Sequence, residues 1–277
     1  MLREILDLDD TGARTREDVF VGRSHPMPGG RVFGGQVAAQ AVTAATRTVP
    51  DDRFPHSLHG YFLRPGDPDL PITFAVDRMH DGRSFSRRGV RAFQSGVPIF
   101  SSIVSYQDED PGMEHQQGMP DVPRPEEIEA GDPGSPLLRA NPIEARHVEG
   151  DIWQSVADAR PRQAVWMRIR GPLDGDPALH RAVLAYMTDF TIQESVLRAH
   201  GISWRTPGLR TASLDHAIWW HRFAPADEWL LYVSESPSAQ GGRGLSTGRL
   251  FTEKGVLVAS VAQEIMARVP NDAEPAS

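Results

Sequence analysis

Residues 34–47 read Gly-Gly-Gln-Val-Ala-Ala-Gln-Ala-Val-Thr-Ala-Ala-Thr-Arg, and this stretch decides the fold. Its apolar residues recur at three- and four-residue intervals, which predicts a helix from Gly35 to Arg47 with one apolar stripe. The stripe consists of Val37, Ala38, Ala41, Val42 and Ala45. Because nearly all of its side chains are small, we expect other elements to pack closely around this helix.

After this helix, apolar and polar residues alternate, which is the pattern of half-buried strands. The alternating runs are Ile72, Phe74 and Val76, then Val90 and Ala92, and then residues 97–106 after the turn sequence Gln94-Ser95-Gly96. A long helix followed by successive antiparallel strands predicts an α+β unit in which the helix lies on a curved sheet.

The second half of the chain repeats the first. Three segments match in order at nearly constant offsets: Ser57-Leu58-His59 with Ser213-Leu214-Asp215, residues 82–86 with residues 242–246, and residues 96–100 with residues 255–259. Helical spacing recurs over residues 178–200, and strand patterns recur over residues 212–221, 228–234, 248–251 and 256–268. The repeat predicts two copies of one α+β unit with paired sheets.

A segment rich in proline, glycine and acidic residues separates the two copies. It opens with Asp108-Glu109-Asp110-Pro111-Gly112 and continues to about residue 150. Because such a composition buries little apolar surface, we expect a surface linker with one short edge strand near its end. The predicted organisation is an N-terminal unit over residues 1–107, a linker over residues 108–150 and a C-terminal unit over residues 151–277.

The composition excludes several classes of protein. The 277 residues include no cysteine, which removes a thiol nucleophile, a cysteine zinc site and a disulfide scaffold. The formal net charge is −8 and the basic residues are scattered, so we expect no nucleic-acid partner. The N-terminus reaches acidic residues before an apolar run of signal-peptide length, and no stretch approaches the roughly 20 apolar residues of a membrane span. We therefore expect no membrane insertion and a cytoplasmic location.

Four motifs make the chain resemble the type II acyl-CoA thioesterases, which include bacterial thioesterase II and peroxisomal acyl-CoA thioesterases. They are Arg-Val-Phe-Gly-Gly-Gln-Val at residues 31–37, His-Ser-Leu-His-Gly-Tyr-Phe-Leu-Arg-Pro-Gly at 56–66, Leu-Asp-His-Ala-Ile-Trp-Trp-His at 214–221 and Gly-Val-Leu-Val-Ala-Ser at 255–260. The resemblance runs from about Phe20 to Arg268. It implies an α+β double hotdog, in which each of two tandem repeats wraps a curved antiparallel sheet around a long helix.

Two polar residues do not fit the apolar faces on which they lie. Gln263 shares a strand face with apolar residues, and the matching position in the first repeat is Val104. Asp189 shares the apolar stripe of the second helix, and counting back from Ser57 and Ser213 matches it with Phe33. A buried amide or carboxylate is costly unless it has partners, so both side chains need an explanation.

The resemblance supplies one explanation. In the family, an Asp on the helix, a Ser or Thr opening the next strand and a Gln on the last strand hold and activate one water molecule. These roles transfer to Asp189 as the general base and to Ser213 and Gln263 as the groups that position the water. The residues alone leave other interpretations open. Asp189 could pair with an arginine, Gln263 with strand backbone, and Ser213 could simply begin a strand.

The resemblance also implies an acyl-CoA substrate. We expect backbone N–H groups of Gly34 and Gly35 to polarise the thioester carbonyl and Arg88 and Arg243 to contact the nucleotide phosphates, although solvated arginines are the simpler interpretation of the last two. We expect no metal and no added cofactor. Hotdog proteins imply a homo-oligomer, built by sheet extension or by back-to-back packing.

Other functions are weighed on the same residues. Residues 244–248 match the G-x-S-x-G motif of α/β-hydrolases, but no histidine follows Ser246 to complete a triad. His56 with His59, and His216 with His221, fall on opposite strand faces, so we expect packing at strand ends rather than a metal site. A hotdog hydratase would need a histidine beside Asp189, and its sequence neighbours supply none. A non-catalytic acyl-CoA-binding or regulatory protein stays open as the alternative to a thioester hydrolase.

Overall fold

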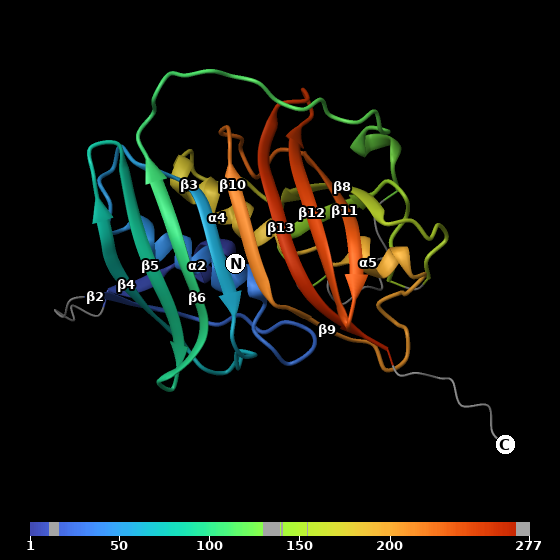
Figure 1. The fold of residues 1–277 in the computed structure, drawn as a ribbon, viewed down its shortest axis with the longest axis horizontal. Helices are drawn as coiled ribbons and strands as arrows, with labels where there is room; N and C mark the ends of the chain where they lie inside the picture. Colours follow the sequence, from blue (N-terminus) through green and yellow to red (C-terminus); the bar gives the residue numbers. More distant parts are fainter. Residues whose placement is uncertain (11–16, 130–138, 140, 154, 270–277) are drawn as a thin grey trace.

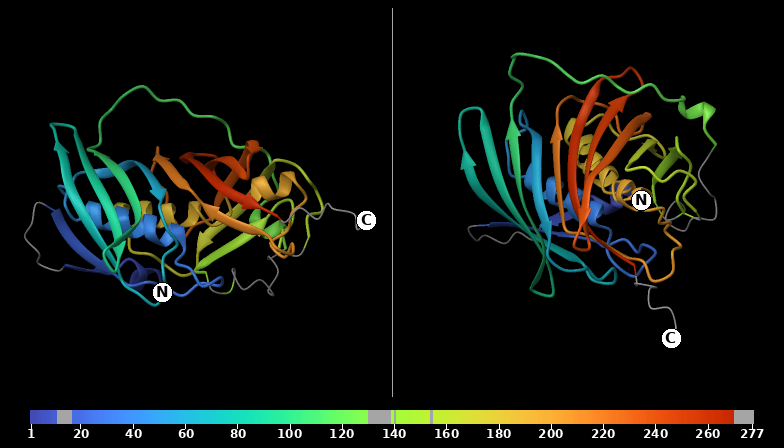
Figure 2. Two further views of the ribbon diagram at one scale, coloured as in Figure 1. Left: turned by 60° about the horizontal axis from the view of Figure 1, so that its bottom comes forward. Right: turned by 45° about the vertical axis from the view of Figure 1, so that its right-hand side comes forward.

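The computed structural model describes residues 1–10, 17–129, 139, 141–153 and 155–269 of the protein. Within these residues, thirteen strands form one antiparallel sheet that curves around two helices (Figures 1 and 2). The N-terminal half contains α1 (Leu2–Ile5), β1 (Leu8–Asp10), β2 (Glu17–Gly22), α2 (Gly34–Thr46), β3 (Phe54–Phe62), β4 (Ile72–Asp81), β5 (Phe85–Gln94) and β6 (Val97–Gln107).

The C-terminal half has the same plan. It contains a short 3₁₀ helix η1 (Pro125–Glu127), β7 (Ile143–His147), β8 (Arg162–Ile169), α4 (Pro177–Thr188), α5 (Glu194–Ala199), β9 (Arg210–Ser213), β10 (Asp215–Trp220), β11 (Leu230–Gln240), β12 (Arg243–Thr252) and β13 (Leu257–Arg268). The sheet runs β1-β2-β4-β5-β6-β3-β10-β13-β12-β11-β8-β7, and β9 pairs with β13. Each half therefore wraps a sheet around one long helix, which confirms the predicted double hotdog.

The two halves join through their central strands and their helices. β3 pairs antiparallel with β10, with Tyr61 opposite Asp215 and Ser57 opposite Trp219. Inside the sheet, α2 packs against α4, and the N-terminus of α2 meets the C-terminus of α4. The helices are thus antiparallel neighbours, and each end of one helix lies beside the opposite end of the other.

Helix α2 is enclosed on nearly all sides, as its small side chains predict. It packs against strands β3 to β6 as well as against α4, and its alanines from Ala38 to Ala45 are fully buried. Alanine and glycine have small side chains that let neighbouring backbones approach closely, so they suit a helix in such an enclosed place.

The second helix differs from the prediction. Helical spacing predicts one helix over residues 178–200, but α4 ends at Thr188 and α5 begins at Glu194. Asp189 is the C-cap of α4, and its side chain bonds to groups outside the helix. The β-branched Thr191 and Ile192 that follow are poor helix formers, so these tertiary contacts outweigh the helical pattern of the sequence.

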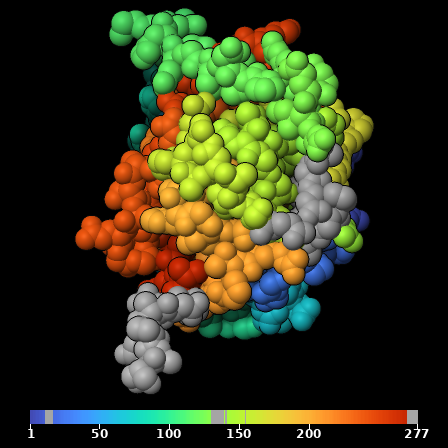
Figure 3. Space-filling model, turned by 90° about the vertical axis from the view of Figure 1, so that its right-hand side faces the viewer, coloured from blue at the N-terminus to red at the C-terminus, as the bar shows by residue number. Residues whose placement is uncertain are grey.

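The linker is more closely attached than its composition suggests. Met119, Val122 and Ile128 pack against a small apolar cluster on the outer face of β8, β11 and β12. Gln116 bonds to the backbone of Gly255 and Leu257. In Figures 1 and 3 the green segment accordingly lies along the C-terminal half. Residues 130–138 and 140, which hold part of the predicted linker, lie outside the described residues, and β7 is the edge strand that follows them.

The search for membrane-spanning helices gives a negative result for the described residues. None of their helices combines the length and the apolar character that a bilayer crossing requires.

Candidate active site

The residues singled out by the sequence meet where the two halves join. Asp189 follows the last residue of α4, is 3% exposed, and lies at the N-terminus of α2. The backbone N–H of Gly35 donates to Asp189 Oδ2 at 2.7 Å, although 154 residues separate the two in sequence. A carboxylate at a helix N-terminus is stabilised by the unpaired N–H groups and by the partial positive charge there.

Ser213 and Gln263 complete a closed set of hydrogen bonds with Asp189. Asp189 Oδ1 accepts from Ser213 Oγ at 3.1 Å and from Gln263 Nε2 at 2.9 Å. The second Nε2 hydrogen of Gln263 is donated to Ser213 Oγ at 2.8 Å. Ser213 is the last residue of β9, which pairs with β13, so the serine and the glutamine come from neighbouring strands.

Burial and hydrogen bonding act on the Asp189 carboxyl in opposite directions. Burial raises its pKa above the ordinary value for Asp, while the charge of His216 and the hydrogen bonds from Gln263, Ser213 and Gly35 lower it. The effect of burial is the larger, so the pKa of Asp189 is raised. A carboxylate with a raised pKa is a stronger base, and general bases in enzymes are commonly adjusted in this way.

A pocket of about 370 Å³ opens onto this set of residues. Asp189, Gln193 and Ser213 lie in its wall, and Gly34 lies beside them at the start of α2. The rest of the wall is mostly apolar, with Met27, Val32, Phe33, Val37, Phe62, Leu63, Ile99 and Leu214 among its residues. The pocket also includes two exposed arginines, Arg31 and Arg64. An apolar cleft with a polar group at one place and cations at another suits an amphipathic anion.

The structure divides the two predicted glycines between different roles. The N–H of Gly35 is engaged by Asp189, so it holds the base and does not face the pocket. Gly34 lines the pocket, and a Cβ added to it would lie 2.8 Å from Asp189 Oδ2. A Cβ on Gly35 would lie 2.5 Å from the backbone oxygen of Tyr186. Both positions require glycine because α2 and the end of α4 approach so closely.

The arginines predicted to contact phosphate lie elsewhere. Arg88 is 1% exposed and donates to Thr48, to Asp81 and to backbone oxygens of the N-terminal half. Its donors are used within the protein, which contradicts the predicted phosphate contact. Arg243 is about half exposed, pairs with Glu264 at 3.0 Å and lines a different pocket, beside α5.

The match of Asp189 with Phe33 is wrong. Asp189 follows the C-terminus of α4, whereas Phe33 precedes the N-terminus of α2. The residue that follows α2, and so corresponds to Asp189, is Arg47. Counting back from the serines fails because α5 and the loop after it lengthen the second half between its helix and its next strand.

Two residues of the site were not identified from the sequence. Gln193 Nε2 donates to Ser213 Oγ at 3.1 Å, and its Oε1 is buried without a partner among the described residues. His216, predicted to pack at a strand end, is bonded to Gln263. Gln193 gave no signal because residues 189–193 were predicted as helix. His216 did give a signal, because strand alternation places it on the same inner face as Ile218 and Trp220.

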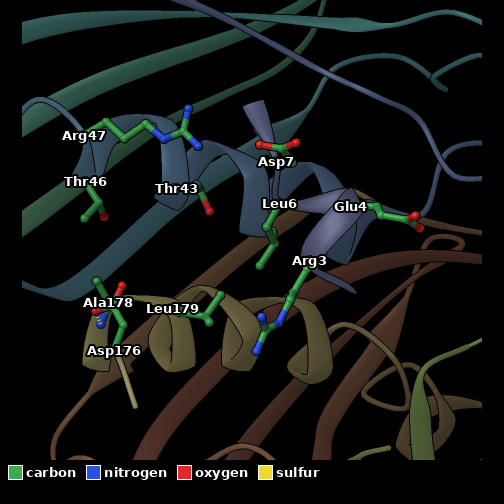
Figure 4. A pocket seen from close by; sticks show the side chains of 10 residues that line it. All are labelled: Arg3, Glu4, Leu6, Asp7, Thr43, Thr46, Arg47, Asp176, Ala178 and Leu179. Carbon is green, nitrogen blue, oxygen red and sulfur yellow. Dashed lines mark hydrogen bonds between the residues drawn. The ribbon is translucent and has the colours of Figure 1, made fainter. Parts of the chain in front are cut away.

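A second pocket lies at the opposite ends of the same two helices. It has a volume of about 510 Å³ and lies between the C-terminal part of α2, the N-terminal part of α4 and the segment of α1 (Figure 4). Here Arg47 takes the place that Asp189 has in the site, and it donates to the backbone oxygen of Leu8. This pocket therefore has no carboxylate at the place of Asp189. The two related places therefore differ in the charge that they present at the end of the helix.

The described residues support neither the hydrolase motif around Ser246 nor a metal site. Ser246 of the G-x-S-x-G match lies in β12, fully buried, with its Oγ 2.8 Å from Ser195 Oγ. The described part of the chain contains no group of three or more His, Asp or Glu side chains placed to hold a metal ion.

Comparisons with known proteins agree on one family. Residues 23–107 match the model of an acyl-CoA thioesterase N-terminal domain, and residues 114–267 match that of an acyl-CoA thioesterase C-terminal domain. The chain is 40% identical over 274 residues to acyl-coenzyme A thioesterase 8 of Homo sapiens, covering 91% of this chain and 85% of the relative. It is 35% identical over 269 residues to acyl-CoA thioesterase 2 of Haemophilus influenzae, covering 90% and 92%. The crystal structure of an acyl-CoA thioesterase II from Mycobacterium marinum matches with a TM-score of 0.84 and 41% identity, over 99% of this chain and 100% of that one.

Proposed function

Because the chain belongs to the acyl-CoA thioesterase family, we propose that it hydrolyses acyl-CoA esters by direct attack of water at the site formed by Asp189, Ser213 and Gln263. The observation that carries the proposal is the set of hydrogen bonds that joins these three side chains beside an apolar pocket. Such a set holds a buried carboxylate ready to accept a proton and surrounds it with groups that orient a water molecule.

The reaction needs only groups that the site contains. Asp189 removes a proton from the water while the water oxygen attacks the thioester carbonyl carbon. The carbon–sulfur bond then breaks, and coenzyme A leaves as a thiolate that takes up the proton accepted by Asp189, which restores the carboxylate. The free acceptor Oε1 of Gln193 lies at the same place and suits the second hydrogen of the water. Gly34, whose N–H no described residue engages, lies at the start of α2, where a donor favours the developing oxyanion.

The substrate is recognised by its two unlike ends. The apolar wall of the pocket suits the acyl chain, and the exposed Arg31 and Arg64 suit the phosphates of coenzyme A. We expect Arg31→Ala and Arg64→Ala each to raise KM for acyl-CoA about tenfold, the loss of one charge-assisted phosphate contact, with kcat unchanged. Steady-state kinetics at two salt concentrations measure this. Arg243→Ala is the matched control. A rise in KM for that variant alone would show that Arg243, and not Arg31 or Arg64, contacts the phosphates.

A thiol-release assay with acyl-CoA esters of increasing chain length tests the activity itself. The protein contains no cysteine, so a thiol reagent reports only the coenzyme A that is released. Turnover on one or more esters supports the proposal and defines the preferred chain length. Tight binding of acyl-CoA without turnover on any ester would instead establish the alternative, a non-catalytic acyl-CoA-binding protein.

We also infer a cytoplasmic homo-oligomer. Tyr61, Ile103 and Trp219 are exposed apolar side chains on the outer face of adjacent strands β3, β6 and β10, at the centre of the sheet. Exposed apolar patches of this kind mark interaction surfaces, and this one favours back-to-back packing of two sheets. We expect Trp219→Glu to lower the molar mass measured by light scattering in solution. Met79→Glu, an exposed control on β4, should leave it unchanged. A monomeric wild type would contradict the inference.

A further inference from the structure

The hydrogen bonds of Gln263 continue to a buried histidine outside the pocket. His216 lies on β10 and is 1% exposed, and its Nδ1 is 2.5 Å from Gln263 Oε1. Its Nε2 is 3.0 Å from Oγ1 of Thr188, the residue before Asp189. We propose that His216 is a positioning residue for thioester hydrolysis that fixes the orientation of the Gln263 amide. The proposal rests on the catalytic roles assigned to Asp189, Ser213 and Gln263 above.

The chemistry of the donors and acceptors sets the orientation of the Gln263 amide and the hydrogen on His216 Nδ1. The Asp189 carboxylate can only accept, so the amide of Gln263 must turn its NH₂ group toward Asp189 and Ser213. This places Oε1 against His216, and a carbonyl oxygen can only accept. The ring therefore carries a hydrogen on Nδ1. Its Nε2 contacts Thr188 Oγ1, a hydroxyl that can accept from the ring when it donates to the backbone oxygen of Ala185 and can donate to the ring otherwise. A reversed amide would place the NH₂ group against the His216 N–H.

The hydrogen bond from His216 to Gln263 is needed most when Asp189 becomes protonated. While Asp189 is ionised, its charge alone disfavours a reversed amide. Once it has accepted a proton from water, the carboxyl group can donate as well as accept, and that preference is lost. The hydrogen bond from His216 Nδ1 does not depend on the proton at Asp189. It keeps the NH₂ group of Gln263 directed into the site throughout the reaction.

The internal repeat supplies independent support. In the N-terminal half, Leu58 of β3 lies opposite Val104 of β6. In the C-terminal half, the register that pairs Ala217 with Ala262 continues to His216 and Gln263. The strand pairing thus makes His216 the counterpart of Leu58, two residues beyond the Leu214 that the sequence repeat matches with it. An apolar pair in one copy is thus matched by a hydrogen-bonded pair in the other. A histidine that served only to fill space would not require a change in its cross-strand partner.

Two substitutions at position 216 test the proposal. His216→Leu introduces the residue of the first repeat and removes the donor to Gln263. His216→Asn retains an N–H group at nearly the same distance from the backbone. We expect His216→Leu to lower kcat 10- to 100-fold with KM changed less than twofold, and His216→Asn to recover kcat to within about threefold of wild type. Equal kcat losses in both variants, or none in His216→Leu, would overturn the proposal.

A double-mutant cycle separates positioning from a general effect on folding. In a Gln263→Leu background there is no amide to orient, so we expect His216→Leu to cause less than a twofold further loss of kcat. A loss of the same size in both backgrounds would show a structural role and overturn the proposal. The Gln263→Leu single variant separates the catalytic role of Gln263 from the positioning role of His216. If it keeps wild-type kcat, the catalytic role of Gln263 fails and the role of His216 fails with it. If it is impaired while His216→Leu is not, only the positioning role fails.

Discussion

Asp189→Asn is expected to lower kcat for acyl-CoA hydrolysis by at least about 100-fold, the usual contribution of a general base, with little change in KM. The amide occupies the same volume but cannot accept a proton from water. The substrate contacts assigned to the pocket wall and to Arg31 and Arg64 do not involve Asp189, so binding should persist. Thiol release and binding of a non-hydrolysable acyl-CoA analogue, with thermal unfolding as a check on the fold, measure the two effects separately.

The pH dependence of the reaction provides a second measure of the same group. Because burial raises the pKa of Asp189, the wild-type kcat should fall on acidification at a pH above the range in which an ordinary Asp titrates. The free energy of unfolding depends on pH in the opposite direction to kcat. The protonated carboxyl is favoured by the fold, so its stabilising contribution is present at acidic pH and is lost as the pH rises through the raised pKa.

Asp215→Asn is the matched control for this experiment. Asp215 precedes His216 on β10 and is partly buried, with a pKa that burial also raises, but it accepts from the backbone of Glu264 and does not line the pocket. We expect its kcat to stay within twofold of wild type. An Asp189→Asn variant that keeps more than a tenth of wild-type kcat would refute the assignment of Asp189 as the base.

The second large effect concerns stability. Arg88→Met is expected to reduce the free energy of unfolding by about 3 kcal/mol and to leave KM for acyl-CoA unchanged. Arg88 is fully buried and satisfies the backbone oxygen of Thr48, just beyond α2, together with Thr48 Oγ1 and backbone oxygens of β4 and β5. Methionine fills much of the volume, but it leaves several buried acceptors without a donor. Urea denaturation measures the loss.

The acidic partner of Arg88 adds a dependence on pH. Burial alone would raise the pKa of Asp81, but hydrogen bonds from Ser86 and Arg88 hold it below its usual value. A lowered pKa contributes stability that is present at neutral pH and is lost as the pH falls through that lowered value, so the difference between wild type and Arg88→Met should shrink in acid. Arg243→Met, which removes an exposed ion pair, should change stability by no more than about 0.5 kcal/mol. Wild-type stability of Arg88→Met would show that its hydrogen bonds are replaced by water.

Much of the fold follows from local patterns. The small residues of α2, the alternation in β4 to β6 and the turn at Ser95 and Gly96 each specify an element without reference to the rest of the chain, and the structure confirms them. The interruption after Thr188 could not be read in this way. The pattern over residues 178–200 is helical, and only the contacts of Asp189 with Gly35, Ser213 and Gln263 show why the helix ends there.

The same division holds for the arginines. Arg88 and Arg243 have the same side-chain chemistry as Arg31 and Arg64, and sequence reasoning chose the first pair for phosphate binding. The structure buries one of these, places the other beside a different pocket, and locates the second pair at the candidate site. A charged side chain is identified by sequence, but its direction and its partners depend on which strands become neighbours.

By itself, the sequence determined the two repeats, a long helix pattern in each, and the two polar residues, Asp189 and Gln263, that depart from their apolar surroundings. These are properties of periodicity and of residue type, which act over a few residues. The tertiary structure decided which of those residues meet. Antiparallel packing of α2 and α4 brings Gly35 to Asp189, and the pairing of β9, β10 and β13 brings Ser213 and His216 to Gln263. Hydrogen bonds act only over about 3 Å, so a site whose directly bonded members are up to 154 residues apart exists only once the sheet has closed around both helices.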